Sequence, residues 1–61
     1  MIREIITNVG NFSKFNDIKL FMLDEKVDSI EILSIRLWNG DYLHKGLLGV
    51  FTYSEILAIN N

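Results

Sequence analysis

The sequence contains no cysteine and only one histidine, His44. Without cysteine the chain can form neither disulfides nor thiolate metal sites, and one histidine builds a zinc site only with carboxylates or a second chain. We therefore expect no metal and no cofactor. A chain of 61 residues is one small domain, residues 1–61. Such a domain buries only roughly 60% of its unfolded surface, so its stability is marginal unless it associates.

Excess positive charge and long apolar runs are also lacking. Six Lys and Arg residues stand against eight Asp and Glu residues, a formal net charge of −2, whereas nucleic-acid binding usually needs a basic excess that neutralises phosphates. No apolar run is longer than the four residues at 20–23, far short of the roughly 20 residues that span a bilayer. The N-terminus shows no signal-peptide pattern. We expect a cytoplasmic protein that does not bind membranes and for which nucleic acid is an improbable partner.

Apolar residues are abundant instead. They make up 49% of the chain, and the mean hydropathy is +0.23. This is more apolar surface than one thin core readily covers, which favours a homo-oligomer or a permanent complex with another protein.

The strongest local signal is Asn39-Gly40 between two strand-like runs. It predicts a type I′ hairpin, because both central residues of that turn need positive φ and these two tolerate it best. The resulting register pairs Trp38 with Asp41 and Arg36 with Leu43. One face of this hairpin reads as core: Leu33, Ile35, Leu37, Tyr42 and His44. The other is mixed: Ser34, Arg36, Trp38, Asp41, Leu43 and Lys45.

The first strand of this hairpin, residues 29–38, changes phase. Ile30 and Ile32 share one face, whereas Leu33 and Ile35 fall on the other. Such a slip within one strand predicts a β-bulge or a bend from one sheet face to another.

The preceding segments are predicted mostly as strands. Residues 2–9 show a helical stripe, but their β-branched residues favour a strand. Phe12 and Phe15 are expected to anchor a loop onto the core. Residues 18–23 are almost entirely apolar and are predicted as a buried strand.

At the C-terminus, Thr52-Tyr53-Ser54-Glu55 matches a capping box. It predicts a helix from Tyr53 to about Ile59, docked through Tyr53, Ile56 and Leu57, after a short strand at residues 49–51. The predicted fold is therefore mainly β: an SH3-like or open barrel or sheet of about five strands with a short C-terminal helix. The alternative is an α+β fold with an N-terminal helix.

Catalytic motifs are weak. The predicted register places Asp41 and Ser34 on the face opposite His44, so no catalytic triad forms within the hairpin. The carboxylates of residues 24–31 lie in a predicted surface turn without the apolar pocket that would raise a pKa. We expect that the protein is not an enzyme.

The outer hairpin face is the candidate partner-binding site: Arg36, Trp38, Leu43 and Lys45. Tryptophan and arginine are enriched at interface hot spots. In the structural alternative, Trp38 closes one end of the core and Arg36 pairs with Asp41 or Glu31.

The first functional hypothesis is a non-enzymatic protein-binding module that acts as an oligomer or as a small regulator or inhibitor of a larger partner. A small acidic protein without catalytic residues suits such an accessory role, and its size and character are compatible with an origin in a phage or mobile element. The alternative is a nucleic-acid or small-ligand binding barrel, with stacking by Trp38, Tyr42 and Tyr53 and anion contacts from Arg36 and Lys45.

Overall fold

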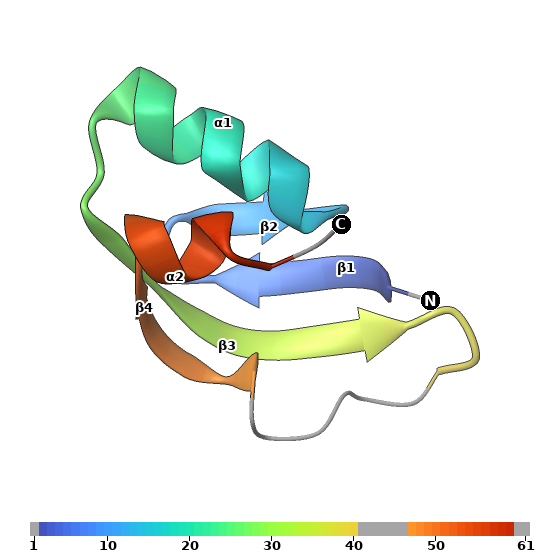
Figure 1. The fold of residues 1–61 in the computed structure, drawn as a ribbon. Coiled ribbons are helices and arrows are strands. Elements are labelled where there is room, and N and C mark those ends of the chain that lie inside the picture. Colours follow the sequence, from blue (N-terminus) through green and yellow to red (C-terminus); the bar gives the residue numbers. More distant parts are fainter. Residues whose placement is uncertain (1, 41–46, 60–61) are drawn as a thin grey trace.

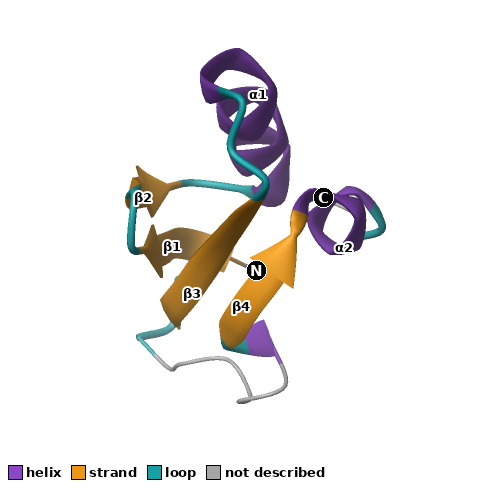
Figure 2. Cartoon of the chain, turned by 90° about the vertical axis from the view of Figure 1, so that its left-hand side faces the viewer, coloured by secondary structure: helices purple, strands orange, loops and turns teal. Residues whose placement is uncertain are grey.

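The computed structural model describes residues 2–40 and 47–59. The elements in chain order are β1 (Ile2–Thr7), β2 (Gly10–Phe12), α1 (Phe15–Glu25), β3 (Ser29–Leu37), β4 (Gly49–Thr52) and α2 (Tyr53–Leu57). In this part of the chain the strands form one open antiparallel sheet in the order β2-β1-β3-β4. Both helices cover the same face of the sheet, and the other face is open (Figure 1, Figure 2).

The predicted mainly β, open-sheet architecture with a short C-terminal helix is confirmed. The described sheet has four strands rather than about five, and it does not close into a barrel. Residues 2–7 form a strand, so the alternative with an N-terminal helix is wrong.

The strand predicted at residues 18–23 is wrong, because these residues lie in α1. An unbroken apolar run does not by itself distinguish a buried strand from a buried helix. Phe15, Ile18 and Met22 follow helical spacing and are at most 2% exposed, whereas Leu20 and Leu23 are more than half exposed. The segment is thus amphipathic with a helical period, which the neighbouring exposed leucines mask in the sequence.

The core lies between the sheet and the helices. Eight apolar side chains are fully buried there: Ile5, Phe15, Ile18, Met22, Ile30, Ile32, Ile35 and Ile56. Phe12 packs against this cluster and meets the Phe21 ring edge to face, with centroids 5.5 Å apart. Phe12 and Phe15 therefore anchor the segment between β1 and α1 to the core, as predicted, although they lie in β2 and α1 rather than in a loop.

The predicted β-bulge is confirmed in β3. Ile6 pairs with Ser34 and Thr7 pairs with Ile32, so Leu33 has no partner on β1. The extra residue restores the phase and puts Ile35 on the same face as Ile32, against the helices. Leu33 itself is 51% exposed, so its predicted place on the core face is wrong.

The turn after β3 differs from the predicted type I′ hairpin. Gly40 has the expected positive φ, 91°, but Lys26 is the only non-glycine residue with positive φ in the part of the chain described, so Asn39 does not adopt that conformation. The Gly40 amide donates to the Leu37 carbonyl at 3.1 Å. Trp38 and Asn39 are therefore the central residues, one position earlier than predicted.

Beyond this turn, the chain returns as β4, which pairs antiparallel with the first part of β3, from Ser29 to Ile32. The pairing predicted for the end of β3 stays a prediction. The predicted second strand of the hairpin, with Leu43 and Lys45, lies outside the described residues.

The capping box predicted at the start of the C-terminal helix is confirmed. The Glu55 amide donates to Thr52 Oγ1 at 3.2 Å, and the Thr52 amide donates to Glu55 Oε1 at 2.9 Å, which completes the capping box. Ile56 is buried and Tyr53 packs against the core, as expected. Leu57 is 54% exposed, so its predicted docking role is wrong.

Deletion of single residues in β3 tests the bulge. Removing Leu33 leaves Ile30, Ile32 and Ile35 on one face, so we expect a folded protein with a denaturant midpoint close to that of the parent. Removing Glu31 instead puts Ile30 out of phase with the rest of the core, and we expect a loss of about 3 kcal/mol or more. Equal destabilisation by the two deletions in urea titrations would contradict the bulge.

Candidate functional site

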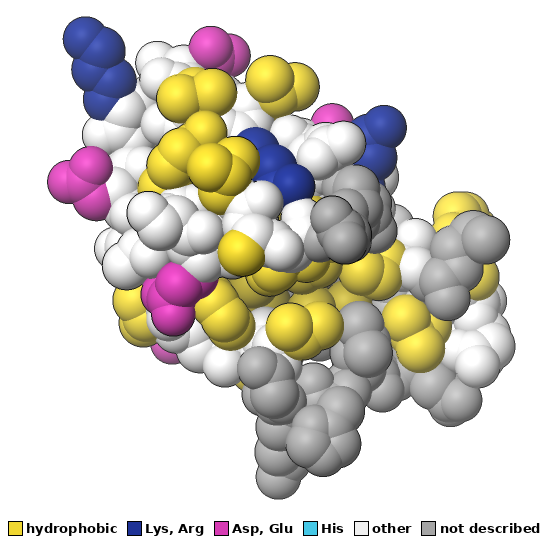
Figure 3. Space-filling view, in the orientation of Figure 1, with side chains coloured by type: hydrophobic (Ala, Val, Ile, Leu, Met, Phe, Trp, Pro, Cys, Tyr) yellow, Lys and Arg dark blue, Asp and Glu magenta, His cyan; other side chains and the backbone are white. Residues whose placement is uncertain are grey.

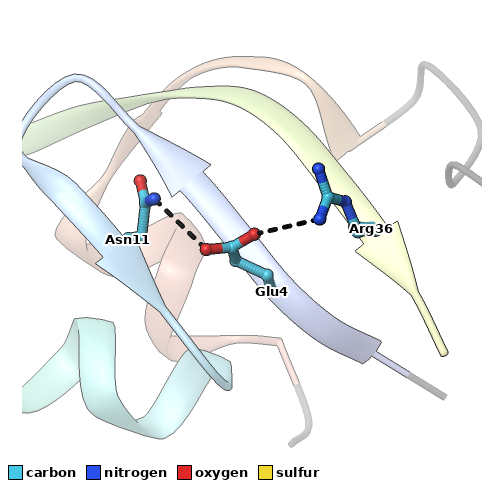
Figure 4. Close-up of polar contacts among 3 residues, drawn as sticks. All are labelled: Glu4, Asn11 and Arg36. Atoms are coloured by element: carbon cyan, nitrogen blue, oxygen red, sulfur yellow. Dashed lines mark hydrogen bonds and ion pairs between the residues drawn. The ribbon is translucent and has the colours of Figure 1, made fainter.

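The open face of the sheet carries a polar cluster centred on Glu4. Arg36 lies directly across from Glu4 on β3, with 3.9 Å between Nη1 and Oε1. Asn11 Nδ2, on β2, donates to the other carboxylate oxygen at 3.2 Å (Figure 4). These three residues alternate with the core residues of their strands, which is why they share the open face.

This polar cluster contributes little to stability. The side chains of Arg36 and Glu4 are 37% and 32% exposed. An ion pair this open to solvent contributes at most about 1 kcal/mol. The pair instead determines how the Glu4 carboxylate is oriented on the sheet.

Trp38 lies at the end of the open face, just beyond β3. Its side chain is 64% exposed. The Arg3 guanidinium carbon lies 5.3 Å from the centre of the Trp38 ring, a cation–π contact. The β1–β3 register pairs Ile2 with Leu37 and Glu4 with Arg36, so Arg3 is an extra residue in β1 at the point where β3 ends.

An open groove of about 300 Å³ runs beside this pair, lined by Arg3, Glu4, Asn11, Phe12, Ser13 and Trp38. It combines a cation, a carboxylate, an amide and a hydroxyl with two aromatic rings. Such a lining offers hydrogen bonds and apolar contact, as a peptide-binding surface does.

A second hollow, of about 240 Å³, lies where the end of α1 approaches the start of α2, lined by Met22, Leu23, Lys26, Val27, Asp28 and Tyr53. Exposed apolar side chains also gather over α1 on the helical side of the molecule (Figure 3). Leu20 and Leu23 on α1 and Leu57 on α2 are each more than half exposed.

The structure places two of the predicted partner-binding residues close to one another. Arg36 pairs with Glu4, and Trp38 and Glu4 line the same groove. The exposure of Trp38 shows that it does not close the core, and Arg36 pairs with Glu4 rather than with Glu31. Leu43 and Lys45 lie outside the described residues.

Sequence reasoning missed Arg3, Glu4 and Asn11. No motif marks them, because they come next to Trp38 and Arg36 only when β1 pairs with β3 and β2 with β1. The one available signal was the strand assignment of residues 2–7, which places Glu4 on the face opposite Ile5.

The part of the chain that the structure describes does not meet the requirements of a metal site. In residues 2–40 and 47–59, no group of three or more His, Asp or Glu side chains could hold a metal ion. His44 and Asp41, the sequence candidates for catalysis, are not among these residues. Within the same ranges, no helix is long and apolar enough to cross a membrane.

Comparison of this chain with protein-family models, with curated proteins and with solved structures finds no match.

Alanine substitutions test whether this surface is needed for folding. We expect Arg36→Ala and Trp38→Ala each to change the free energy of unfolding by about 1 kcal/mol or less, because both side chains are substantially exposed. Ile35→Ala, on the opposite face of β3, serves as the comparison and should cost about 2–5 kcal/mol. A loss at Trp38 as large as that at Ile35 would show that Trp38 is a core residue.

Proposed function

We propose that this chain is a non-enzymatic protein-binding module that acts as a small regulator or inhibitor of a larger partner, which it contacts through the open sheet face. The observation that carries the proposal is Trp38, 64% exposed at the rim of a groove and in contact with Arg3. Large aromatic side chains in such positions are the commonest energetic anchors of protein interfaces.

Other apolar side chains extend this surface. Leu33 is exposed at the bulge of β3, and Val50 of β4 is 69% exposed opposite Glu31. Val50 alternates with Phe51, which packs against the core, so Val50 lies on the open face. A sheet face with tryptophan at one end and aliphatic side chains farther along suits a protein partner, because apolar anchors surrounded by polar groups are typical of interfaces.

Charge favours a protein over a nucleic acid as the partner. The net charge is −2, and the one ion pair in the described residues joins Arg36 to a carboxylate on the same face. A steep loss of affinity for an oligonucleotide with rising salt would instead support the nucleic-acid alternative, since phosphate contacts release counterions.

Self-association is supported by composition, because apolar residues make up 49% of the chain. Residues 18–23 add nothing to this, because they form a helix whose buried side chains, Ile18 and Met22, belong to the core. Exposed apolar side chains nevertheless occur on both the sheet side and the helical side. Sedimentation equilibrium separates the cases: a 7.1 kDa species at micromolar concentration would exclude an oligomer as the working form.

Substitution of Trp38 tests the proposed surface. We expect Trp38→Ala to keep the fold and to weaken association with a partner, captured from cells that encode the protein, by about 2 kcal/mol. The measurement is a binding isotherm with parent and variant proteins.

The matched control is Leu20→Ala, an equally exposed apolar side chain, 61%, on the helical side of the molecule. It should leave the affinity unchanged. If Leu20→Ala weakens binding and Trp38→Ala does not, the partner binds the helices and the proposed surface is wrong.

A further inference from the structure

β1 has one partly uncovered edge. β3 pairs with β1 from Ile2 to Thr7, but β2 pairs only with the half from Ile5 to Thr7. β2 ends at Phe12, and the chain then leaves the sheet to enter α1. Among the described residues, the first half of β1 therefore has no strand beside it on the β2 side.

The groove lies along this uncovered edge. Arg3 and Glu4 line it from β1, and residues 11–13 line it from the end of β2. A segment that entered the groove would continue the line of β2. Backbone amides and carbonyls at an open sheet edge bind extended segments as added strands, with alternate side chains directed to each face.

Among the described residues of the groove, the negative charge of Glu4 is neutralised by a partner, whereas the positive charge of Arg3 is not. Both oxygens of the Glu4 carboxylate have partners, Arg36 and Asn11. Arg3 forms no ion pair with any residue in the described ranges, and its guanidinium contacts the Trp38 ring. The charge left for a ligand is therefore positive, which favours an acidic side chain.

We propose that an extended acidic segment of the partner protein binds along residues 2–4 as an added strand in line with β2. An Asp or Glu side chain of the segment pairs with Arg3, and an apolar side chain packs on Trp38. This inference rests on the proposed function and names the class of partner that the site receives.

A bulge and a charged residue are also devices that protect a sheet edge from unwanted pairing. The exposed Trp38 beside them distinguishes this edge from one that is only protected. Protection is achieved by charge and irregular geometry, whereas an exposed indole adds apolar surface that attracts other chains. The combination of Arg3 and Trp38 is therefore better explained by recognition than by protection.

Peptide selection tests the inference. Decapeptides are selected from a random library on the parent protein, and their binding is followed by the fluorescence of Trp38, the only tryptophan in the chain. We expect the selected peptides to share an acidic residue. Changing it to the neutral amide should weaken binding about tenfold, and the same change should have little further effect on the Arg3→Gln protein.

Two controls complete the design. Lys26→Gln removes an exposed positive charge at the far end of α1 and should leave peptide affinity unchanged. Methylation of alternate backbone nitrogens of the peptide should abolish binding in one register and not in the other, because an added strand donates only every second amide.

Three outcomes would overturn the inference: no peptide is selected, binding is indifferent to Arg3→Gln and to the acidic residue, or methylation at every position is tolerated. Circular dichroism of Arg3→Gln confirms that the variant is folded. If the partner protein still depends on Trp38 in any of these cases, the proposed function stands and only the acidic added strand is rejected.

Discussion

The pairing of β1 with β3 is the interaction on which the rest of the structure depends. It is the one contact between strands that runs the whole length of β1, from Ile2 to Thr7. On the helical face it sets Ile5 opposite Ile35, both at most 1% exposed. On the open face it sets Glu4 opposite Arg36. One strand pair thus supplies the centre of the core and the centre of the candidate site.

The other elements add to this pair from its edges and from one face. β2 and β4 are short outer strands, and both helices pack over the buried isoleucines. The bulge at Leu33 makes this possible, because without it Ile35 and Ile32 would point to opposite faces of the sheet. A thin core of eight side chains is complete only because that one residue is left outside the ladder.

Short strands and irregular pairing also shape the candidate site. β2 is three residues long, so it covers half of one edge of β1 and leaves the groove beside Arg3 and Glu4. The extra residue in β1, Arg3, lies where β3 ends and Trp38 begins the turn. Short strands and irregular pairing cost the sheet some hydrogen bonds, and at this end they leave a tryptophan, a cation and an open edge together on the surface.

The sequence by itself determined the features that depend on near neighbours. The capping box at Thr52 and Glu55 needs only a span of four residues, and the phase change around Leu33 implies a bulge or a bend wherever the strand lies. The strand character of residues 2–7 and 29–37 follows from β-branched residues and alternation. Alternation along one strand also put Trp38 and Arg36 on the face opposite Ile35, although it left open whether Trp38 closes the core.

Tertiary structure decided the remainder. The apolar run at residues 18–23 was predicted as a strand, but the segment forms a helix that packs one side against the sheet. The Asn39-Gly40 signal predicts a turn centred on these two residues, but the Gly40 amide donates to the Leu37 carbonyl, so the turn is centred on Trp38 and Asn39. The neighbours of Trp38 and Arg36 come from β1 and β2, more than 20 positions away in the chain. Local propensity carries no information on which strands pair. The groove and the charges that line it therefore depend on the assembled sheet and cannot be predicted from single segments.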